Sequence, residues 1–136
     1  MKWANSLIRI ANHEVETLQK RLAEIVDRRT MMEMRLAALY AEAEAEQARA
    51  HLDVEAGWYH VGFLQGWRIR RDQLKIQITG ALAEEAGARD ALSRAFEELK
   101  KFEHVAEVAR VADVREQGRR DTAAMDEMGL RKAMGR

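Results

Sequence analysis

Apolar residues recur along both halves of the chain at alternating steps of three and four residues. In the first half the repeat runs over 1–43, and only Arg29 interrupts it. In the second half it runs over 64–109, where Arg71 and Glu85 interrupt it. Such a repeat places the apolar side chains on one face of a helix. The pattern predicts two long amphipathic helices, each with a single apolar stripe.

The two stripes match each other when the chain folds back on itself around Trp58. Apolar residues then meet in successive layers, as an antiparallel coiled coil requires. The predicted layers pair Leu39 with Ile78, Leu22 with Ala95, Leu18 with Leu99, and Val15 with Phe102. We therefore expect an all-α fold of two long helices in an antiparallel coiled-coil hairpin. Residues beyond about Gln117 have no counterpart on the first helix, so the C-terminal helix should be the longer one.

Two glycines suggest where the chain reverses direction. Gly57 and Gly62 stand where the apolar stripe is broken. Glycine is common in turns because it weakens a helix. The expected elements are a first helix over about 3–55, a turn over about 56–62 and a second helix over about 63–132, within one hairpin domain that covers 1–136.

Four charged residues, Arg29, Glu46, Arg71 and Glu85, fall within the apolar stripes. In the predicted register Glu46 and Arg71 share a layer, and Arg29 lies one layer from Glu85. Each charge would then have an opposite partner, and a slip of one heptad would separate both pairs. Polar layers set the register of a coiled coil even when they cost stability. We expect these residues to fix the pairing of the two helices.

Composition agrees with long helices and argues against several functions. Charged residues make up 34% of the 136 residues, and there is no proline to stop a helix. The chain has no cysteine, so it has no disulfide and no thiolate metal site. Lys plus Arg and Asp plus Glu each number 23, so no net charge attracts nucleic acid or anionic lipid. No apolar run approaches the roughly 20 residues of a membrane span. We expect a soluble intracellular protein without direct membrane insertion.

The sequence carries no recognisable motif for a catalytic, cofactor-binding or metal-binding site. No glycine-rich loop ends in Gly-Lys-Ser/Thr, so nucleotide hydrolysis is not expected. His13 and Glu14 lack the second histidine of a zinc-binding helix motif. Acidic pairs such as Glu97 and Glu98 have no concave pocket that could shift their pKa values. The expectation is a protein that is not an enzyme and uses no cofactor.

Apolar residues outside the stripes mark a candidate docking surface. Ile69 and Ile76 lie one heptad apart on the outer face of the second helix, and Tyr40 flanks the stripe of the first helix. The aromatic residues around the expected turn are Trp58, Tyr59 and Phe63. Exposed apolar residues gathered in one region are typical of contact with another protein. A second set outside the stripe consists of Val105, Val108, Val111 and Ala112, where either the stripe changes phase or a partner covers it.

Three parts of the chain resemble one protein family. They are the opening stretch SLIRIANHEV at 6–15, the aromatic segment from Trp58-Tyr59 to Phe63-Leu64, and the ending RRDTAAMDEMGLRK at 119–132. The ending has a basic, alanine-rich helix followed by an apolar-Asp-Glu-apolar element and more basic residues. Together with the length and the two-helix stripe, these segments make the whole chain resemble FliJ, the small coiled-coil component of the bacterial flagellar type III export apparatus.

The resemblance implies a function in flagellum biogenesis and protein export. Members of the family look like the central stalk of a rotary ATPase. They bind in the centre of the export ATPase ring, link it to the membrane-embedded export gate protein, and escort export chaperones. The protein would then be cytoplasmic and peripheral to the inner membrane at the base of the flagellum, with no nucleic acid as a partner.

The resemblance also implies two contact regions. Tyr40 and Phe63 match the tyrosine and phenylalanine of the family's gate-binding surface, whereas Trp67 stands where an aliphatic residue is usual. With these we group the two outer isoleucines, Ile69 and Ile76. The proposed ATPase-ring contacts match the family's C-terminal element and are Met125, Asp126, Glu127, Arg131 and Lys132.

Two other interpretations remain open from the sequence. The stalk of a virulence injectisome has a similar length and composition. A generic coiled-coil scaffold or dimerisation protein would self-associate through the stripe and would stimulate no ATPase. Nucleic-acid binding through the basic residues of 68–75 and 115–120 is disfavoured because acidic residues face the first of these segments in the predicted register.

Overall fold

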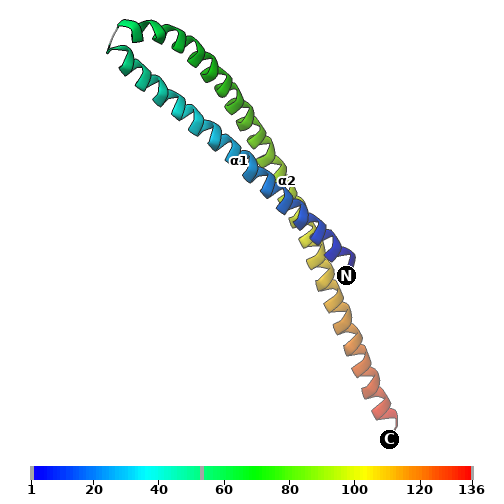
Figure 1. The fold of residues 1–136 in the computed structure, drawn as a ribbon. Helices are drawn as coiled ribbons and strands as arrows, with labels where there is room; N and C mark the ends of the chain where they lie inside the picture. The colour runs from blue at the N-terminus through cyan, green and yellow to red at the C-terminus, as the bar shows by residue number, and fades with distance from the viewer. Residues whose placement is uncertain (1, 53, 136) are drawn as a thin grey trace. The chain divides into compact units, whose positions relative to one another are not determined.

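The computed structural model describes residues 2–52 and 54–135, and Met1, Asp53 and Arg136 lie outside the described residues. The described chain forms two helices, α1 (Lys2–Ala50) and α2 (Val54–Met134), with no strand among these residues. The two helices run antiparallel, and α2 is much the longer (Figure 1). The predicted all-α hairpin with a longer second helix is confirmed.

The connection between the helices lies earlier than the sequence suggested. The predicted turn over 56–62 is helical, and α2 already begins at Val54. Gly57 and Gly62 therefore lie inside α2, neither with a positive φ. A glycine costs a helix interior only about 1 kcal/mol, which a long continuous helix tolerates. Charged residues favour the observed helix ends. Arg49 is a basic residue in the last turn of α1, and Glu55 is an acidic residue in the first turn of α2, so each interacts favourably with the helix dipole.

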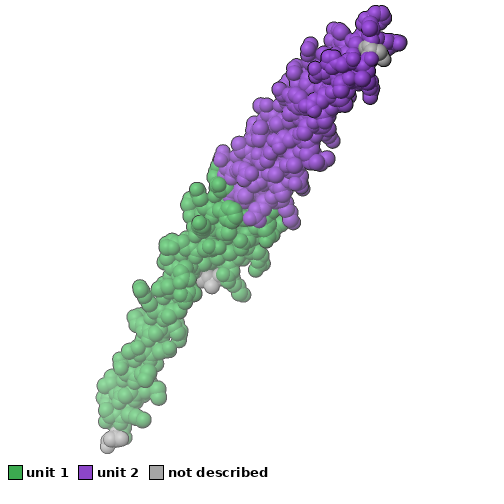
Figure 2. All heavy atoms as spheres, turned by 90° about the vertical axis from the view of Figure 1, so that its left-hand side faces the viewer, with its two compact units in different colours: residues 1–16, 93–136 green, residues 17–92 purple. Residues whose placement is uncertain are grey.

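The chain divides into two compact units, coloured separately in Figure 2: residues 17–92 form one, and residues 1–16 with 93–136 form the other. The first, which we call the hairpin unit, contains the connection and the facing parts of both helices. Its buried residues recur at the predicted three- and four-residue spacing, and they are Ile25, Trp67, Leu74, Ala81, Glu85 and Ala88. Stripe positions rather than outer ones are buried, because each helix can hide only one face from water.

The second unit, which we call the terminal unit, joins the start of α1 to the C-terminal part of α2. Its core is narrow and rich in small side chains: Ala4, Ala11, Val15 and Leu99 are buried. From residue 117 onward every described residue of α2 is exposed. This segment continues as helix although no other part of its unit covers it.

Within the hairpin unit the helices pair about one turn away from the predicted layers. Leu39 was expected opposite Ile78, but it lines a shallow interhelical groove together with Leu74 and Arg70. Arg70 reaches Glu42 across that groove, with Nη2 3.2 Å from Oε1. The earlier connection explains the shift, since a turn moved toward the N-terminus brings earlier α2 residues level with each α1 residue. The stripe positions were predicted correctly, the predicted layer of Leu39 and Ile78 is displaced by about one turn, and Arg29 and Glu85, predicted one layer apart, meet directly.

Candidate interaction surfaces

A charged layer crosses the seam of the hairpin unit, that is, the apolar interface between α1 and α2. Arg29 on α1 donates two hydrogen bonds to Glu85 on α2, from Nε to Oε2 and from Nη2 to Oε1, both at 3.1 Å. Glu85 also accepts from Arg89, and Arg29 also donates to Glu33. Two arginines therefore hold the Glu85 carboxylate, which is the one charged group among the buried residues of the described chain. A bidentate arginine–carboxylate pair fixes both distance and orientation.

The electrostatics of this layer favour the charged forms. The hydrogen bond from Arg29 lowers the pKa of Glu85, and the nearby charges of Arg29 and Arg89 act in the same direction, while desolvation opposes them. The hydrogen bonds to Glu85 and Glu33 raise the pKa of Arg29. Glu85 and Arg29 are thus both charged at neutral pH. The layer has two further members, Glu33 and Arg89, which follow Arg29 and Glu85 at i+4 spacing. This spacing favours ion pairs along a helix and could have been read from the sequence, but the prediction did not use it.

The other expected polar layer does not form in the described structure. Arg71 donates to Asp72 at 3.0 Å, and Glu46 pairs with Arg49 at 3.4 Å. The guanidinium of Arg71 also lies 5.2 Å from the ring centroid of Trp67 on its own helix. The one-turn difference in register accounts for the missing Glu46–Arg71 pair. The contact with the Trp67 ring stabilises the Arg71 guanidinium beside the seam, although no carboxylate of α1 pairs with it in the described structure.

Trp67 is the centre of an aromatic cluster in the hairpin unit. Its side chain is 6% exposed, and Nε1 donates to the backbone oxygen of Leu39 at 2.7 Å. Tyr40 packs edge-on against it, with ring centroids 5.3 Å apart and the planes at 72°. A buried indole N–H requires an acceptor. Here the Leu39 carbonyl of the neighbouring helix supplies it, and the Tyr40 ring beside it distinguishes this position from others along α1.

The five residues predicted for gate contact do not form a single patch. Tyr40 and Trp67 touch, but Trp67 is buried and only Tyr40 presents a surface, at 42% exposed. Phe63 is partly buried and stacks on His60, with ring centroids 6.2 Å apart. The strongly exposed members are Ile69 and Ile76. At about 100° per residue they lie on the outer side of α2, away from Trp67.

Trp58 and Tyr59, which the sequence placed in a turn, lie in the first turns of α2 and are 75% and 71% exposed. They border a shallow hollow with Val54 and Glu55. The sequence identified the two aromatic residues, but it did not predict that Val54 and Val61 would lie with Trp58 on an exposed face of a helix. Only the earlier start of α2 reveals that face.

The predicted ATPase contacts lie on the exposed C-terminal segment of α2. Met125 is 72% exposed, and Met128 and Leu130 on the same segment are 66% and 63% exposed. Arg131 pairs with Glu127 at 3.0 Å within the helix. The segment thus presents apolar and charged side chains together, with no element of the terminal unit covering them.

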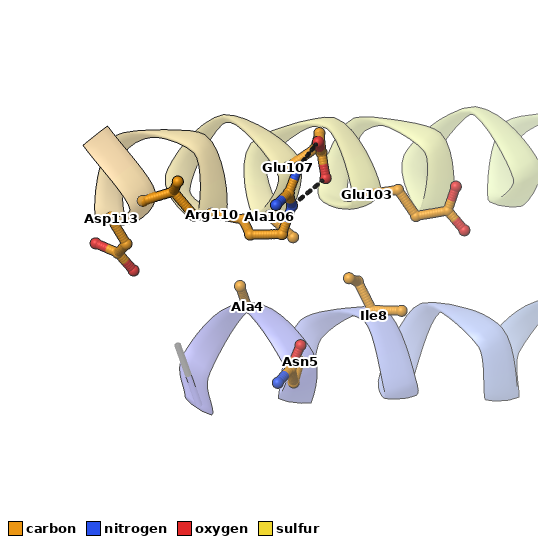
Figure 3. Close-up of a pocket in the computed structure, with 9 residues that line it drawn as sticks. Ala4, Asn5, Ile8, Glu103, Ala106, Glu107, Arg110 and Asp113 are labelled. Atoms are coloured by element: carbon orange, nitrogen blue, oxygen red, sulfur yellow. Dashed lines mark hydrogen bonds and ion pairs between the residues drawn. The ribbon is translucent and has the colours of Figure 1, made fainter. Parts of the chain in front are cut away.

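Elsewhere in the terminal unit, a shallow groove runs between the start of α1 and α2 (Figure 3). Ala4 and Ile8 project from α1 toward Ala106 on α2. On the α2 side of the groove, Arg110 Nη2 lies 2.7 Å from Glu107 Oε1, and this hydrogen bond lowers the pKa of Glu107. Small side chains on both helices leave this groove open.

Among the described residues there is neither a candidate membrane span nor a candidate metal site. No helix in 2–52 or 54–135 is both long enough and apolar enough to span a bilayer. The same residues contain no group of three or more His, Asp or Glu side chains that could hold a metal ion. The surfaces described above are therefore the candidates for function.

Comparison with known proteins gives one consistent result. The family model described as "Flagellar FliJ protein" matches residues 4–136. The chain is 56% identical over 132 residues to the Flagellar FliJ protein of Caulobacter vibrioides, in two strains, and the match covers 97% of this chain and 95% of the relative. No solved structure matches the chain. The predicted resemblance is confirmed: the chain belongs to the FliJ family and is a component of the flagellar protein export apparatus.

Proposed function

We propose that this FliJ-family protein is the coupling stalk of the export apparatus. In this proposal the terminal unit binds the centre of the export ATPase ring, the hairpin unit contacts the membrane export gate, and the protein escorts export chaperones. It would work at the cytoplasmic face of the inner membrane, at the base of the flagellum, and it would catalyse no reaction itself. The family membership and the separation of exposed surfaces between two units support this arrangement.

The observation that carries the ATPase assignment is the uncovered end of α2. Every described residue from 117 onward is exposed, and yet the segment is helical and carries Met125, Met128 and Leu130. An isolated helix of this length is only marginally stable in water. Such a segment gains stability when a partner buries its apolar side chains, which is expected of a helix that inserts into a ring. Met125, Asp126, Glu127, Arg131 and Lys132 are the proposed contacts.

The gate assignment is supported by the exposed part of the aromatic cluster and by the outer isoleucines. Tyr40 offers a half-exposed aromatic ring, held by its packing on Trp67. Trp67 and Phe63 would act mainly by positioning, because both face inward. Ile69 and Ile76 would make direct contact. Chaperone escort rests on the family membership alone.

Truncation tests the ATPase assignment. Removing 125–136 should abolish stimulation of the hexameric export ATPase, while circular dichroism shows that the hairpin unit remains helical, since that unit makes no use of the removed residues. The control is Ile69→Glu with Ile76→Glu, which alters only the hairpin unit and should leave stimulation intact. Full stimulation by the truncated protein would contradict the assignment, and no stimulation by the intact chain would favour a generic scaffold.

A further inference from the structure

Five exposed apolar residues form a line along the outer side of α2 in the hairpin unit. We call them the outer stripe: Val54, Trp58, Val61, Ile69 and Ile76, which are 73%, 75%, 62%, 60% and 72% exposed. At about 100° per residue their side chains leave the helix within about 40° of one direction. That direction is roughly opposite to the buried Trp67 and Leu74. The helix therefore has two apolar faces, and α1 covers only one of them.

The basic side chains around this region are of two kinds. Arg70 pairs with Glu42 and Arg71 pairs with Asp72. Arg68 and Lys75, by contrast, are exposed and have no ion pair among the described residues. Both precede an isoleucine of the outer stripe, so they repeat at heptad spacing along one edge of it. At about 100° per residue the opposite edge carries the neutral Gln73 and, five turns earlier, the exposed Glu55, so unpaired basic residues lie along one edge alone.

An apolar face with one basic edge is a surface against which an amphipathic helix can pack, as in a coiled coil. We propose that the outer stripe docks an amphipathic helix of a partner protein whose edge is acidic. Carboxylates of that helix would pair with Arg68 and Lys75, and its apolar residues would cover Ile69, Ile76 and Trp58. Asp72 also lies on the line, but its ion pair with Arg71 offsets its charge.

Charge argues against an antiparallel pairing with a second copy of this chain. In an antiparallel pairing of two outer stripes about a two-fold axis, like edges face each other. Arg68 and Lys75 of both copies would then lie on one side of the interface and repel each other. An acidic helix from another protein meets no such repulsion. The proposal deepens the proposed gate-facing role of Ile69 and Ile76 by giving the chemistry of their partner.

A synthetic probe tests the proposal without any export protein. The probe is a fluorescein-labelled peptide with leucine and alanine at its heptad positions and glutamate along both edges. Its length is about 24 residues, to match the stripe. Fluorescence anisotropy should show binding to the full chain, and a probe with lysine in place of glutamate should bind at least about tenfold more weakly. Added salt should reduce the difference between the two probes.

Two variants sharpen the test. Ile69→Glu with Ile76→Glu should abolish binding, whereas Met31→Glu with Met34→Glu, which changes equally exposed residues on α1, should not alter it. Arg68→Glu with Lys75→Glu should reverse the preference, so that the lysine probe binds more tightly. Circular dichroism confirms that each variant remains folded.

Several outcomes would overturn the proposal. They are equal binding of the two probes, equal loss of binding in the α1 control, or a dimer in sedimentation that the Ile69 and Ile76 substitutions dissociate. The last outcome would assign the stripe to a second copy. None of these results bears on stimulation of the ATPase, so failure here is distinguishable from failure of the proposed stalk function.

Discussion

At the scale of single residues, Glu85 stands out as the buried charged group of the described chain. It is 7% exposed and ionised, and Arg29 and Arg89 both donate to it. A carboxylate in such a place stabilises the fold only while its partners remain, because an unpaired buried charge is costly. The sequence identified Arg29 and Glu85 as opposite charges in neighbouring layers. Their direct bidentate contact depends on the register, which the structure supplies.

Glu85 should make the hairpin unit less stable in acid. The pKa of Glu85 in the folded protein is below its ordinary value of 4.5. Its contribution to the free energy of unfolding is therefore fully present above pH 4.5 and is lost as the pH falls through the lowered pKa. Chemical unfolding measured from pH 7 down to pH 3 should show this loss.

The Glu85→Gln variant is the control for that measurement. It should be less stable than the wild type at neutral pH, and the difference between the two should shrink as the pH falls. Glu107 and Glu116 of the terminal unit, whose pKa values arginines also lower, contribute equally to both proteins. A difference that stays constant across the range would show that the charge of Glu85 does not stabilise the fold.

At the scale of the helices, one hydrogen bond and one aromatic pair lock α2 onto α1. Leucines and alanines of a coiled-coil seam can slide by a heptad and still meet apolar partners. A backbone carbonyl like that of Leu39 recurs one heptad away, but the aromatic ring of Tyr40, which closes over the same indole, does not. This cluster and the Arg29–Glu85 layer fix the register at two separate places in the hairpin unit.

Replacing Trp67 with phenylalanine tests the contribution of the buried indole. The variant loses one hydrogen bond and leaves a small cavity, so the free energy of unfolding should fall by about 2 kcal/mol. Urea unfolding followed by circular dichroism measures the change. Trp58→Phe is the matched control, because Trp58 is 75% exposed, and it should change stability by less than about 0.5 kcal/mol. An equal effect in both variants would contradict the role of the bond.

At the scale of the whole molecule, the chain must fold back on itself rather than pair with another copy. The apolar stripe alone does not decide between these outcomes, because the same seam fits within and between chains. A short connection favours the intramolecular pairing by raising the local concentration of the two helices. The charged layer adds specificity, since every alternative register leaves Arg29 or Glu85 without its partner.

Making that layer apolar should therefore preserve stability and weaken specificity. The double variant Arg29→Leu with Glu85→Leu should unfold at the same or a higher temperature than the wild type, because an apolar layer avoids the desolvation of two charges. Sedimentation at high protein concentration should reveal dimers that the wild type does not form. The exposed pair Arg28–Glu84, 3.0 Å apart, provides the control. Its Leu–Leu replacement should leave the protein monomeric, and a monomeric Arg29–Glu85 variant would remove the specificity role.

The sequence by itself determined the two helices, their buried faces and the family. These follow from local periodicity and from short segments such as 119–132, which no packing can alter. Only the tertiary structure decided where the chain turns, which residues meet across the seam, and that Trp67 is buried while Trp58 is exposed. The reason is that a helix can pass through Gly57 and Gly62 at a small cost, so the turn falls where cross-helix contacts are best satisfied. Those contacts join residues far apart in the chain, and local sequence does not encode them.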